Sequence, residues 1–248
     1  MPLDATSLAL LRRAQRDPDL VLLEGMHALK HAVRFGAHVE VVASPEPDEL
    51  ARLLARVAPD LALPVTPGAV EPGVWRALTG GRVLPSPCLA VARRPEVEVT
   101  AMLARPARLL VLEDPRHLGN TGAVVRVAAA AGLAGVVVVG ELDPWHPTVV
   151  RSAAGLHFAV DVVHLLDLAA LDALMAGSSR PLVALDPEGE AIDRADVPVD
   201  AIVALGTERH GLTDALRARA VLRVAIPMQD GVSSLNLATA AAVLAYRP

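Results

Sequence analysis

Short apolar runs alternate with longer stretches of mixed character along most of the 248 residues. Runs this short, rich in Val, Leu and Ala, predict buried strands, and the stretches between them predict helices. From residue 108 onward the pattern predicts strands at 108–112, 135–139, 160–164, 182–185, 201–205 and 221–226. It predicts helices at 121–131, 147–154, 168–175, 211–218 and 234–246. Such alternation is typical of an α/β protein whose parallel sheet is covered by helices on both faces.

Residues 1–98 predict a smaller α/β domain built from shorter elements. The periodicity predicts helices at 5–16, 25–35 and 48–57 and strands at 20–23, 39–43, 62–65 and 89–92. Before the second domain the apolar runs stop, and Pro, Glu and Arg become frequent, which favours a linker at 99–107. The second domain is then 108–248. Within it, the acidic stretch 186–200 is expected to be a surface loop.

The composition predicts a folded protein and excludes several kinds of site. Hydrophobic residues make up 53% of the chain, enough for a real core, and the single cysteine excludes an internal disulfide framework. No Cys pair has the short spacing of common zinc sites, so no metal is expected. No apolar run approaches the length that spans a bilayer, and acidic Asp4 stands where a signal peptide is basic. We therefore expect a cytoplasmic protein without a membrane partner.

The net charge of −5 argues mildly against a nucleic-acid binder but leaves room for a local basic patch. Lys30 is the only lysine, so nearly all strong positive charges are arginines, which favour bidentate contacts to phosphate or carboxylate. A biased genome composition would give the same preference for arginine over lysine. The basic residues of the first two helices form either an RNA-holding face or ordinary solvated surfaces: Arg12, Arg13, Arg16, Lys30 and Arg34.

Three familiar site motifs are absent from the chain. These are the dinucleotide fingerprint G-x-G-x-x-G, the phosphate loop G-x-x-x-x-G-K-[ST] and the nucleophile elbow G-x-S-x-G. Their absence lowers the expectation of a dinucleotide oxidoreductase, a P-loop enzyme or an α/β-hydrolase. The ligand site must be sought in other loops, beyond the carboxyl ends of the strands.

The first such loop leads into the predicted helix at 121–131. Asn120 stands where a helix N-cap is expected. Arg126 is the only charged residue among small apolar ones, so we expect its guanidinium to be buried and to need a partner. That partner is either Glu208, in a buried ion pair, or an anion or hydroxyl of a substrate.

Two further loops carry polar groups. The stretch "ALGTERHGL" at 204–212 places glycines around a polar cluster, which permits close approach of another backbone segment or a ligand. His210 is more typical of a solvated loop than of a catalytic base, because no orienting partner is visible. After the last strand, Ser233 or Ser234 is expected to cap the final helix, with Asn236 in its first turn.

Together these three stretches resemble the three motifs of the SpoU/TrmH family of RNA ribose 2′-O-methyltransferases, which belong to the SPOUT class. The pattern N-x-G-x-x-R-x-A is matched by Asn120, Gly122, Arg126 and Ala128. The pattern G-x-E-x-x-G-L is matched by Gly206, Glu208, Gly211 and Leu212. The pattern I-P-M followed by G-x-x-S-L-N is matched by Ile226–Met228, Gly231 and Ser234–Asn236. The likeness covers roughly residues 108–247.

The resemblance implies a fold that composition does not show, a parallel sheet with a deep C-terminal trefoil knot. It also implies S-adenosylmethionine as cofactor, RNA as substrate and a homodimer. A weaker likeness at Glu24, Gly25 and Ala32 makes residues 1–98 similar to the family's small L30e-like substrate-binding domain. That added domain favours ribosomal RNA as the substrate, within an S-adenosylmethionine-dependent RNA 2′-O-ribose methyltransferase.

By the same resemblance, functional roles carry over to the matching positions. The catalytic set would be Asn120, Arg126, Glu208, Ser234 and Asn236. The cofactor-binding set would be Leu205, Gly206, Thr207, Gly211, Ile226, Met228, Ser234 and Leu235. Gly206, Gly211 and Gly231 would be required because side chains there would obstruct the crossing backbones or the adenosyl group. Arg126 would either assist deprotonation of the ribose hydroxyl or stabilise the developing alkoxide.

Two alternatives remain open at this stage. A tRNA 2′-O-methyltransferase would use the same motifs on a different RNA. A catalytically silent RNA-binding or ribosome-assembly factor would keep the fold without activity, and the retained Asn120, Arg126, Glu208 and Asn236 count against it. A third reading, a dinucleotide-dependent enzyme, lacks its glycine fingerprint.

Overall fold

The computed structural model describes residues 1–207, 210–232 and 234–247 of the chain. By its internal contacts the chain divides into two units. The first unit contains Met1–Glu96 together with Trp145–Ala159, and the second contains Val97–Pro144 and the chain from Val160 onward. Residues 145–159, which the strand and helix pattern assigns to the second domain, thus pack with the first. Within the described ranges, no helix is long and apolar enough to cross a membrane.

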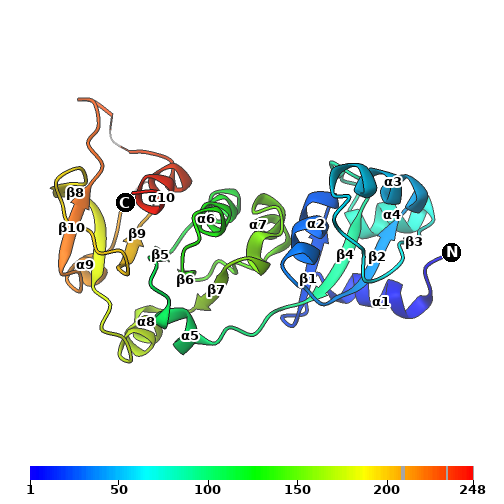
Figure 1. Ribbon diagram of the computed structural model, residues 1–248, viewed down its shortest axis with the longest axis horizontal. Coiled ribbons are helices and arrows are strands. Elements are labelled where there is room, and N and C mark those ends of the chain that lie inside the picture. Colours follow the sequence, from blue (N-terminus) through cyan, green and yellow to red (C-terminus); the bar gives the residue numbers. More distant parts are fainter. Residues whose placement is uncertain (208–209, 233, 248) are drawn as a thin grey trace. The chain divides into compact units, whose positions relative to one another are not determined.

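The second unit is built on a six-stranded sheet in the order β10-β8-β9-β5-β6-β7 (Figure 1). All neighbouring strands in it run parallel, which confirms the predicted parallel α/β sheet. The strands are β5 Leu109–Glu113, β6 Gly135–Val139, β7 Asp161–Leu165, β8 Leu182–Ala191, β9 Ile202–Leu205 and β10 Leu222–Ala225. The helices are α5 Val99–Ala104, α6 Leu118–Ala130, α8 Leu168–Met175, α9 Asp214–Arg217 and α10 Leu237–Ala245.

The centre of this sheet forms the core of the unit. The side chains of Leu109, Leu110, Val111 and Leu112 are fully buried, as expected for a strand covered on both faces. The segment expected to be a linker contributes to this core, because it forms α5 and buries Met102 completely. Its short length and its Pro-rich flanks conceal the helix from a periodicity argument.

Strand β8 departs most from the sequence prediction. It does not end at residue 185, and the stretch 186–200 is not simply a surface loop, because β8 continues to Ala191. Along β10, Arg223 pairs with Ala184 but the next residue, Val224, pairs with Glu190. Residues 185–189 are therefore looped out of the ladder as a large bulge. The shift in pairing register between β8 and β10 therefore determines where residues 185–189 lie.

The first unit contains a four-stranded mixed sheet in the order β1-β4-β2-β3. Its strands are β1 Leu20–Glu24, β2 Val39–Ser44, β3 Gly68–Ala69 and β4 Leu89–Arg93. Its helices are α1 Ala5–Arg13, α2 Met26–Arg34, α3 Pro47–Val57, α4 Pro72–Thr79 and α7 Pro147–Ser152, followed by the short 3₁₀ helix η1 Leu156–Phe158. The strand predicted at 62–65 is wrong. Helix α4 was missed although Pro72 begins it and left-handed Gly80 ends it, both standard helix signals.

A buried carboxylate ties α7 to the first sheet. Glu24, at the end of β1, has a side chain that is only 1% exposed. It accepts two hydrogen bonds from the guanidinium of Arg82, at 3.1 and 2.5 Å, and forms a further ion pair with Arg151 of α7. This carboxylate raises the pKa of Arg82. Glu24, one of the motif positions, therefore has a structural role in this unit.

We expect Glu24→Gln to lower the free energy of unfolding by about 1–3 kcal/mol, because it removes the buried charge that two arginines share as their acceptor. Chemical denaturation of the full chain measures this. Glu40→Gln is the matched control, since Glu40 pairs with the half-exposed Arg93 at the surface, and its effect should stay within about 1 kcal/mol. Equal losses for both variants would contradict a special role for Glu24.

Candidate functional site

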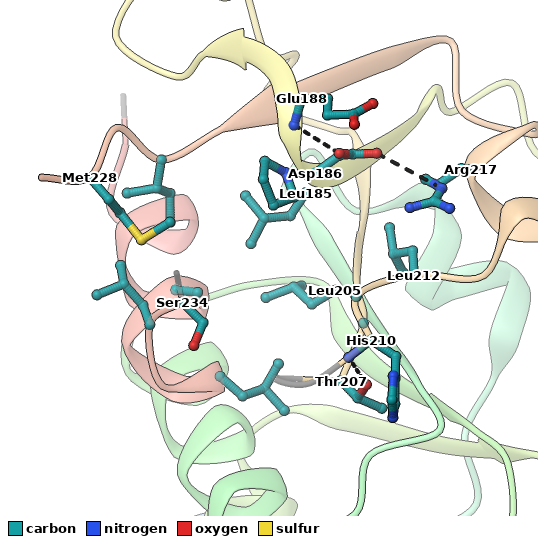
Figure 2. Close-up of a pocket in the computed structure, with 17 residues that line it drawn as sticks. Leu185, Asp186, Glu188, Leu205, Thr207, His210, Leu212, Arg217, Met228 and Ser234 are labelled. Atoms are coloured by element: carbon teal, nitrogen blue, oxygen red, sulfur yellow. Dashed lines mark hydrogen bonds and ion pairs between the residues drawn. The ribbon is translucent and has the colours of Figure 1, made fainter. Parts of the chain in front are cut away.

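A cavity of about 370 Å³ lies where the carboxyl ends of β8, β9 and β10 meet (Figure 2). This is the edge at which parallel sheets bind their ligands, and the volume falls in the range of small-molecule sites. The β8 bulge, the loop after β9, the segment after β10 and the start of α10 supply its walls. These segments are far apart in the sequence and are brought together by the strand order.

All eight residues predicted to bind the cofactor line this one cavity: Leu205, Gly206, Thr207, Gly211, Ile226, Met228, Ser234 and Leu235. Leu185, Leu212, Leu237 and Ala240 extend the apolar part of the wall. Polar groups come from Asp186, Glu188, Thr207, His210, Arg217 and Ser234. The arrangement suits a ligand with a flat apolar portion and a few hydrogen-bonding groups.

The loop after β9 folds back on itself as a tight turn. The amide of Gly211 donates to the carbonyl of Thr207 at 2.9 Å, and the Thr207 amide returns a bond to Gly211 at 3.2 Å. A Cβ on Gly206 would collide with the backbone of Gly211 and Leu212, so no side chain fits there. Glycine is needed here because the backbone of the same turn occupies the space that a Cβ would take.

The other two motif glycines are needed for a different reason. A Cβ on Gly211 or Gly231 would meet no atom of the described residues within 4 Å, so these residues show no obstruction of the kind expected from the sequence. Both residues instead have positive φ angles, +64° and +86°. Side chains disfavour this left-handed region, and glycine adopts it at little cost.

Asn236 organises the start of α10. Its Oδ1 accepts hydrogen bonds from the amides of Ala238, at 2.9 Å, and Thr239, at 3.4 Å. Asn236 is therefore the N-cap, and the expectation that Ser233 or Ser234 caps this helix is wrong for Ser234. Ser233 lies outside the described residues. Ser234 precedes the helix, is exposed and lines the cavity.

A hydrogen bond joins the first motif to the third. The Nδ2 of Asn236 donates to Oδ1 of Asn120 at 2.9 Å, although 116 residues separate the two. The sequence predicts Asn120 as the N-cap of α6, and this prediction is wrong. The helix begins earlier, and His117 occupies the N-cap position. The side chain of Asn120 links the first turns of α6 and α10 through this hydrogen bond.

Arg126 is exposed on α6, so the expectation that it is buried with a partner is wrong. The outward stripe of α6 consists of Gly119, Ala123, Arg126 and Ala130, and the opposite face packs into the core. An all-apolar helix does not reveal by its periodicity which face is outward. Among the described residues Arg126 has no ion-pair partner, which leaves its guanidinium available to a ligand. Glu208, the expected alternative partner and catalytic residue, lies outside the described residues.

Asp186 is the principal residue of the cavity that the sequence did not identify. Its side chain is 3% exposed, and Oδ1 accepts a hydrogen bond from the Glu188 amide at 2.9 Å (Figure 2). Its Oδ2 is buried without a hydrogen-bond partner among the described residues. Leaving such a group unsatisfied costs about 1–3 kcal/mol. The signal that could have found it is the "DPEG" sequence inside an apolar strand, which suggests a bulge.

The described residues do not support two other kinds of chemistry. Burial raises the pKa of the Cys88 thiol to about 12, so it is a thiol rather than a nucleophilic thiolate at neutral pH. The described part of the chain contains no group of three His, Cys, Asp or Glu residues arranged to hold a metal ion.

These features define an α/β protein with a ligand cavity at the carboxyl edge of its parallel sheet. A model of the SpoU rRNA Methylase family matches residues 107–246. The chain belongs to this family.

Two curated relatives extend the likeness. The 23S rRNA (guanosine(2553)-2′-O)-methyltransferase RlmP of Bacillus subtilis (strain 168) is 27% identical over 227 residues, which cover 91% of this chain and 86% of that protein. A 23S rRNA (uridine(2479)-2′-O)-methyltransferase of Streptomyces viridochromogenes is 30% identical over 186 residues, 72% of this chain and 65% of that protein.

Two solved structures are similar over nearly their whole length. An RNA 2′-O ribose methyltransferase is 30% identical, with a TM-score of 0.75 over 98% of this chain and 94% of its own. The SpoU methyltransferase AviRb of Streptomyces viridochromogenes, in complex with AdoMet, has a TM-score of 0.80 at 24% identity, over 98% of this chain and 96% of its own. The second comparison supports the fold alone.

We expect Gly206→Ala to lower the free energy of unfolding by about 2–3 kcal/mol, because its methyl group would overlap the backbone of the turn that it faces. Denaturant titration of the full chain measures the loss. Gly177→Ala is the matched control, since a Cβ there meets no atom within 4 Å, and it should change stability by less than about 0.5 kcal/mol. A Gly206 variant as stable as this control would disprove the crowding.

Proposed function

We propose that this protein transfers a methyl group from S-adenosylmethionine to a ribose 2′-hydroxyl of ribosomal RNA. The observation that carries the proposal is the convergence of eight motif-matched residues on one cavity of about 370 Å³. Membership of the SpoU family and the named activities of the relatives support the same reaction and the same kind of RNA. S-adenosylmethionine is accordingly the cofactor.

The cavity fits this cofactor in both shape and chemistry. Leu205, Ile226 and Leu235 supply apolar surface for an adenine ring, and the absence of a side chain at Gly211 leaves room beside it. Buried Asp186 supplies an unsatisfied acceptor. When bound, the cofactor supplies a methyl group already activated on a sulfonium. The remaining task of the protein is to place the acceptor hydroxyl in line with that group, and orientation of this kind is a major source of rate acceleration.

The linked starts of α6 and α10 would position the RNA. Helix N-termini favour electron-rich groups, and the Asn120–Asn236 bond holds the two helix starts together. Ser234 stands at the same edge with an exposed hydroxyl. We assign these side chains to orientation of the target ribose. Glu208 keeps its proposed place in the catalytic set through the motif match alone.

Arg126 would act by electrostatics. The free pKa of arginine exceeds about 12, so a guanidinium is a poor proton acceptor at neutral pH. An exposed guanidinium can instead hold the phosphate of the target nucleotide and stabilise the alkoxide that develops on its ribose, with the proton lost to phosphate or water.

We expect Arg126→Ala to lower the rate of methyl transfer roughly 10²- to 10³-fold, because a donor that stabilises developing negative charge is lost. The rate is measured with labelled S-adenosylmethionine and ribosomal RNA from a strain lacking this gene. The control is Arg219→Ala, which removes a surface arginine paired with Asp172. An Arg126 variant with a full transfer rate and undiminished RNA binding would refute the assignment.

The same assay tests the function itself. Label at one ribose position of ribosomal RNA would establish activity and substrate together. Label on transfer RNA alone would favour the tRNA enzyme. Cofactor binding without transfer to any RNA, or no cofactor binding at all, would favour a silent RNA-binding factor of the same fold.

We also propose that the C-terminal segment forms a deep trefoil knot. The chain passes from β9 to β10, which lies beyond β8 at the edge of the sheet, and then returns to pack α10 against α6. The loop after β9 and the segment after β10 line the same cavity, so the returning chain lies close to that loop. This strand order and the return of the chain to α6 support the proposal of a knot.

A homodimer through α6 and α10 is our further proposal about the assembly. The outward stripe of α6 is made of small residues around Arg126, and α10 exposes Val243 and Tyr246, which are 38% and 64% exposed. Apolar surface of this kind on a soluble protein is typical of an interface. Small side chains allow the close helix packing that a dimer would use.

We expect Val243→Glu to convert the dimer to a monomer, because it places a charge in an apolar interface. Sedimentation velocity measures the change in mass. Val199→Glu, at a position that is 64% exposed elsewhere in the unit, should leave the dimer intact. A monomeric wild-type protein, or a Val243 variant that stays dimeric, would contradict this interface.

We assign RNA binding to the first unit, in line with its likeness to an L30e-like domain. Arg12, Arg13 and Arg16 are exposed and line a shallow hollow on α1, although Arg13 is paired with Asp17. Arginine side chains grouped in this way suit contacts to an RNA backbone. A ribosomal RNA substrate would place the protein in the cytoplasm.

A further inference from the structure

One polar group of the cavity is left without a role in the motif-based site. The Asp186 carboxylate is buried, yet no motif matches it, and the sequence pattern alone places it in a surface loop. Its Oδ1 is engaged by the Glu188 amide, while Oδ2 has no hydrogen-bond partner among the described residues. The nearest cationic atoms to Oδ2 are Nη1 of Arg223, at 3.7 Å, and Nε of Arg217, at 4.0 Å. Both lie beyond hydrogen-bonding distance.

The backbone around Asp186 holds it at the cavity. Residues 185–189 leave the ladder between β8 and β10, and Leu185, Asp186, Pro187 and Glu188 all line the cavity. At the end of this bulge Gly189 lets β8 approach β10 closely and pair with it again. A Cβ on Gly189 would lie 2.5 Å from backbone atoms of Arg223 and Val224. The carboxylate is therefore fixed by a register shift that only a glycine permits.

An ionised carboxylate only accepts hydrogen bonds, so the ligand that satisfies Oδ2 must donate one. A bound S-adenosyl compound offers three kinds of donor: the adenine amino group, the ribose hydroxyls and the α-ammonium group. An ammonium beside Asp186 would also lie beside Arg217 and Arg223, and like charges repel. The adenine is suited to the apolar wall of the cavity. The ribose hydroxyls are neutral donors, and acidic residues hold ribose hydroxyls in the same way in dinucleotide-binding folds.

We propose that Asp186 accepts a hydrogen bond from a ribose hydroxyl of the bound cofactor and thereby selects ribonucleosides over deoxynucleosides in this cavity. This inference rests on the proposed function, since it concerns the cofactor of that reaction. Arg217 and Arg223 lie beside the carboxylate and favour its orientation without taking up its free lone pairs. Asp186 is a specificity residue of the cofactor site and takes no part in the methyl transfer.

Calorimetric titration of the whole chain tests this with two sets of ligands. The first set is S-adenosylhomocysteine and its 2′,3′-dideoxy analogue, and the second is 5′-methylthioadenosine with its 2′-deoxy and 3′-deoxy analogues. We expect the wild-type protein to bind at least one deoxy form roughly 10- to 100-fold more weakly than its parent, as for loss of a hydrogen bond to a charged group. Asp186→Ala should bind the parent ligands more weakly by a similar factor and lose the discrimination.

A second variant keeps the test decisive if Asp186→Ala does not fold. Asp186→Asn is nearly isosteric and weakens the acceptor by removing its charge, so it should reduce the discrimination while circular dichroism shows an intact fold. Asp172→Asn, which alters a surface carboxylate paired with Arg219, is the control and should discriminate as the wild type does.

The outcomes separate the two proposals. Wild-type binding of S-adenosylhomocysteine without preference over the dideoxy form would overturn the role of Asp186 and leave the proposed function standing. Folded Asp186 variants that keep the full preference would overturn it equally. A wild-type protein that binds neither ligand would overturn the proposed function and this inference together.

Discussion

The parallel alignment of β8, β9 and β10 is the constraint on which the rest of the second unit depends. Parallel strands bring their carboxyl ends to one edge, so three loops from distant parts of the sequence meet there and enclose the cavity. The sheet centre is rigid because its strands are buried on both faces. Function can therefore reside in loops while stability resides in the strands beneath them.

The pairing of α6 with α10 adds the second level of organisation. One hydrogen bond, from the side-chain amide of Asn236 to that of Asn120, joins the starts of the two helices, and the same Asn236 caps α10. A single side chain thus satisfies backbone donors and fixes one helix against another. Small residues on both helices leave an outer face with little polar surface.

Much of the site was accessible from the sequence, and the failures have a common physical origin. Glycines and short polar loops marked two of the segments that line the cavity, at 204–212 and after residue 226, because their local conformations depend on neighbouring residues. The residues expected to bind the cofactor came from the family resemblance, and the segment 185–188 was not identified. Arg126 was wrongly expected to be buried, since a helix of small apolar residues carries no polar stripe to mark its outward face. The caps of α6 and α10 were also misplaced, because several residues at each start can serve as the cap.

The sequence by itself determined the alternation of strands and helices, the buried character of β5 and β6 and the glycines at the turns. These follow from periodicity and from backbone conformations that act over a few residues. Only the tertiary structure decided that Asp186 is buried, that Asn120 meets Asn236 and that residues 145–159 pack with the first unit. Each of these depends on strand register or on contacts between residues far apart in the chain, which no local pattern encodes.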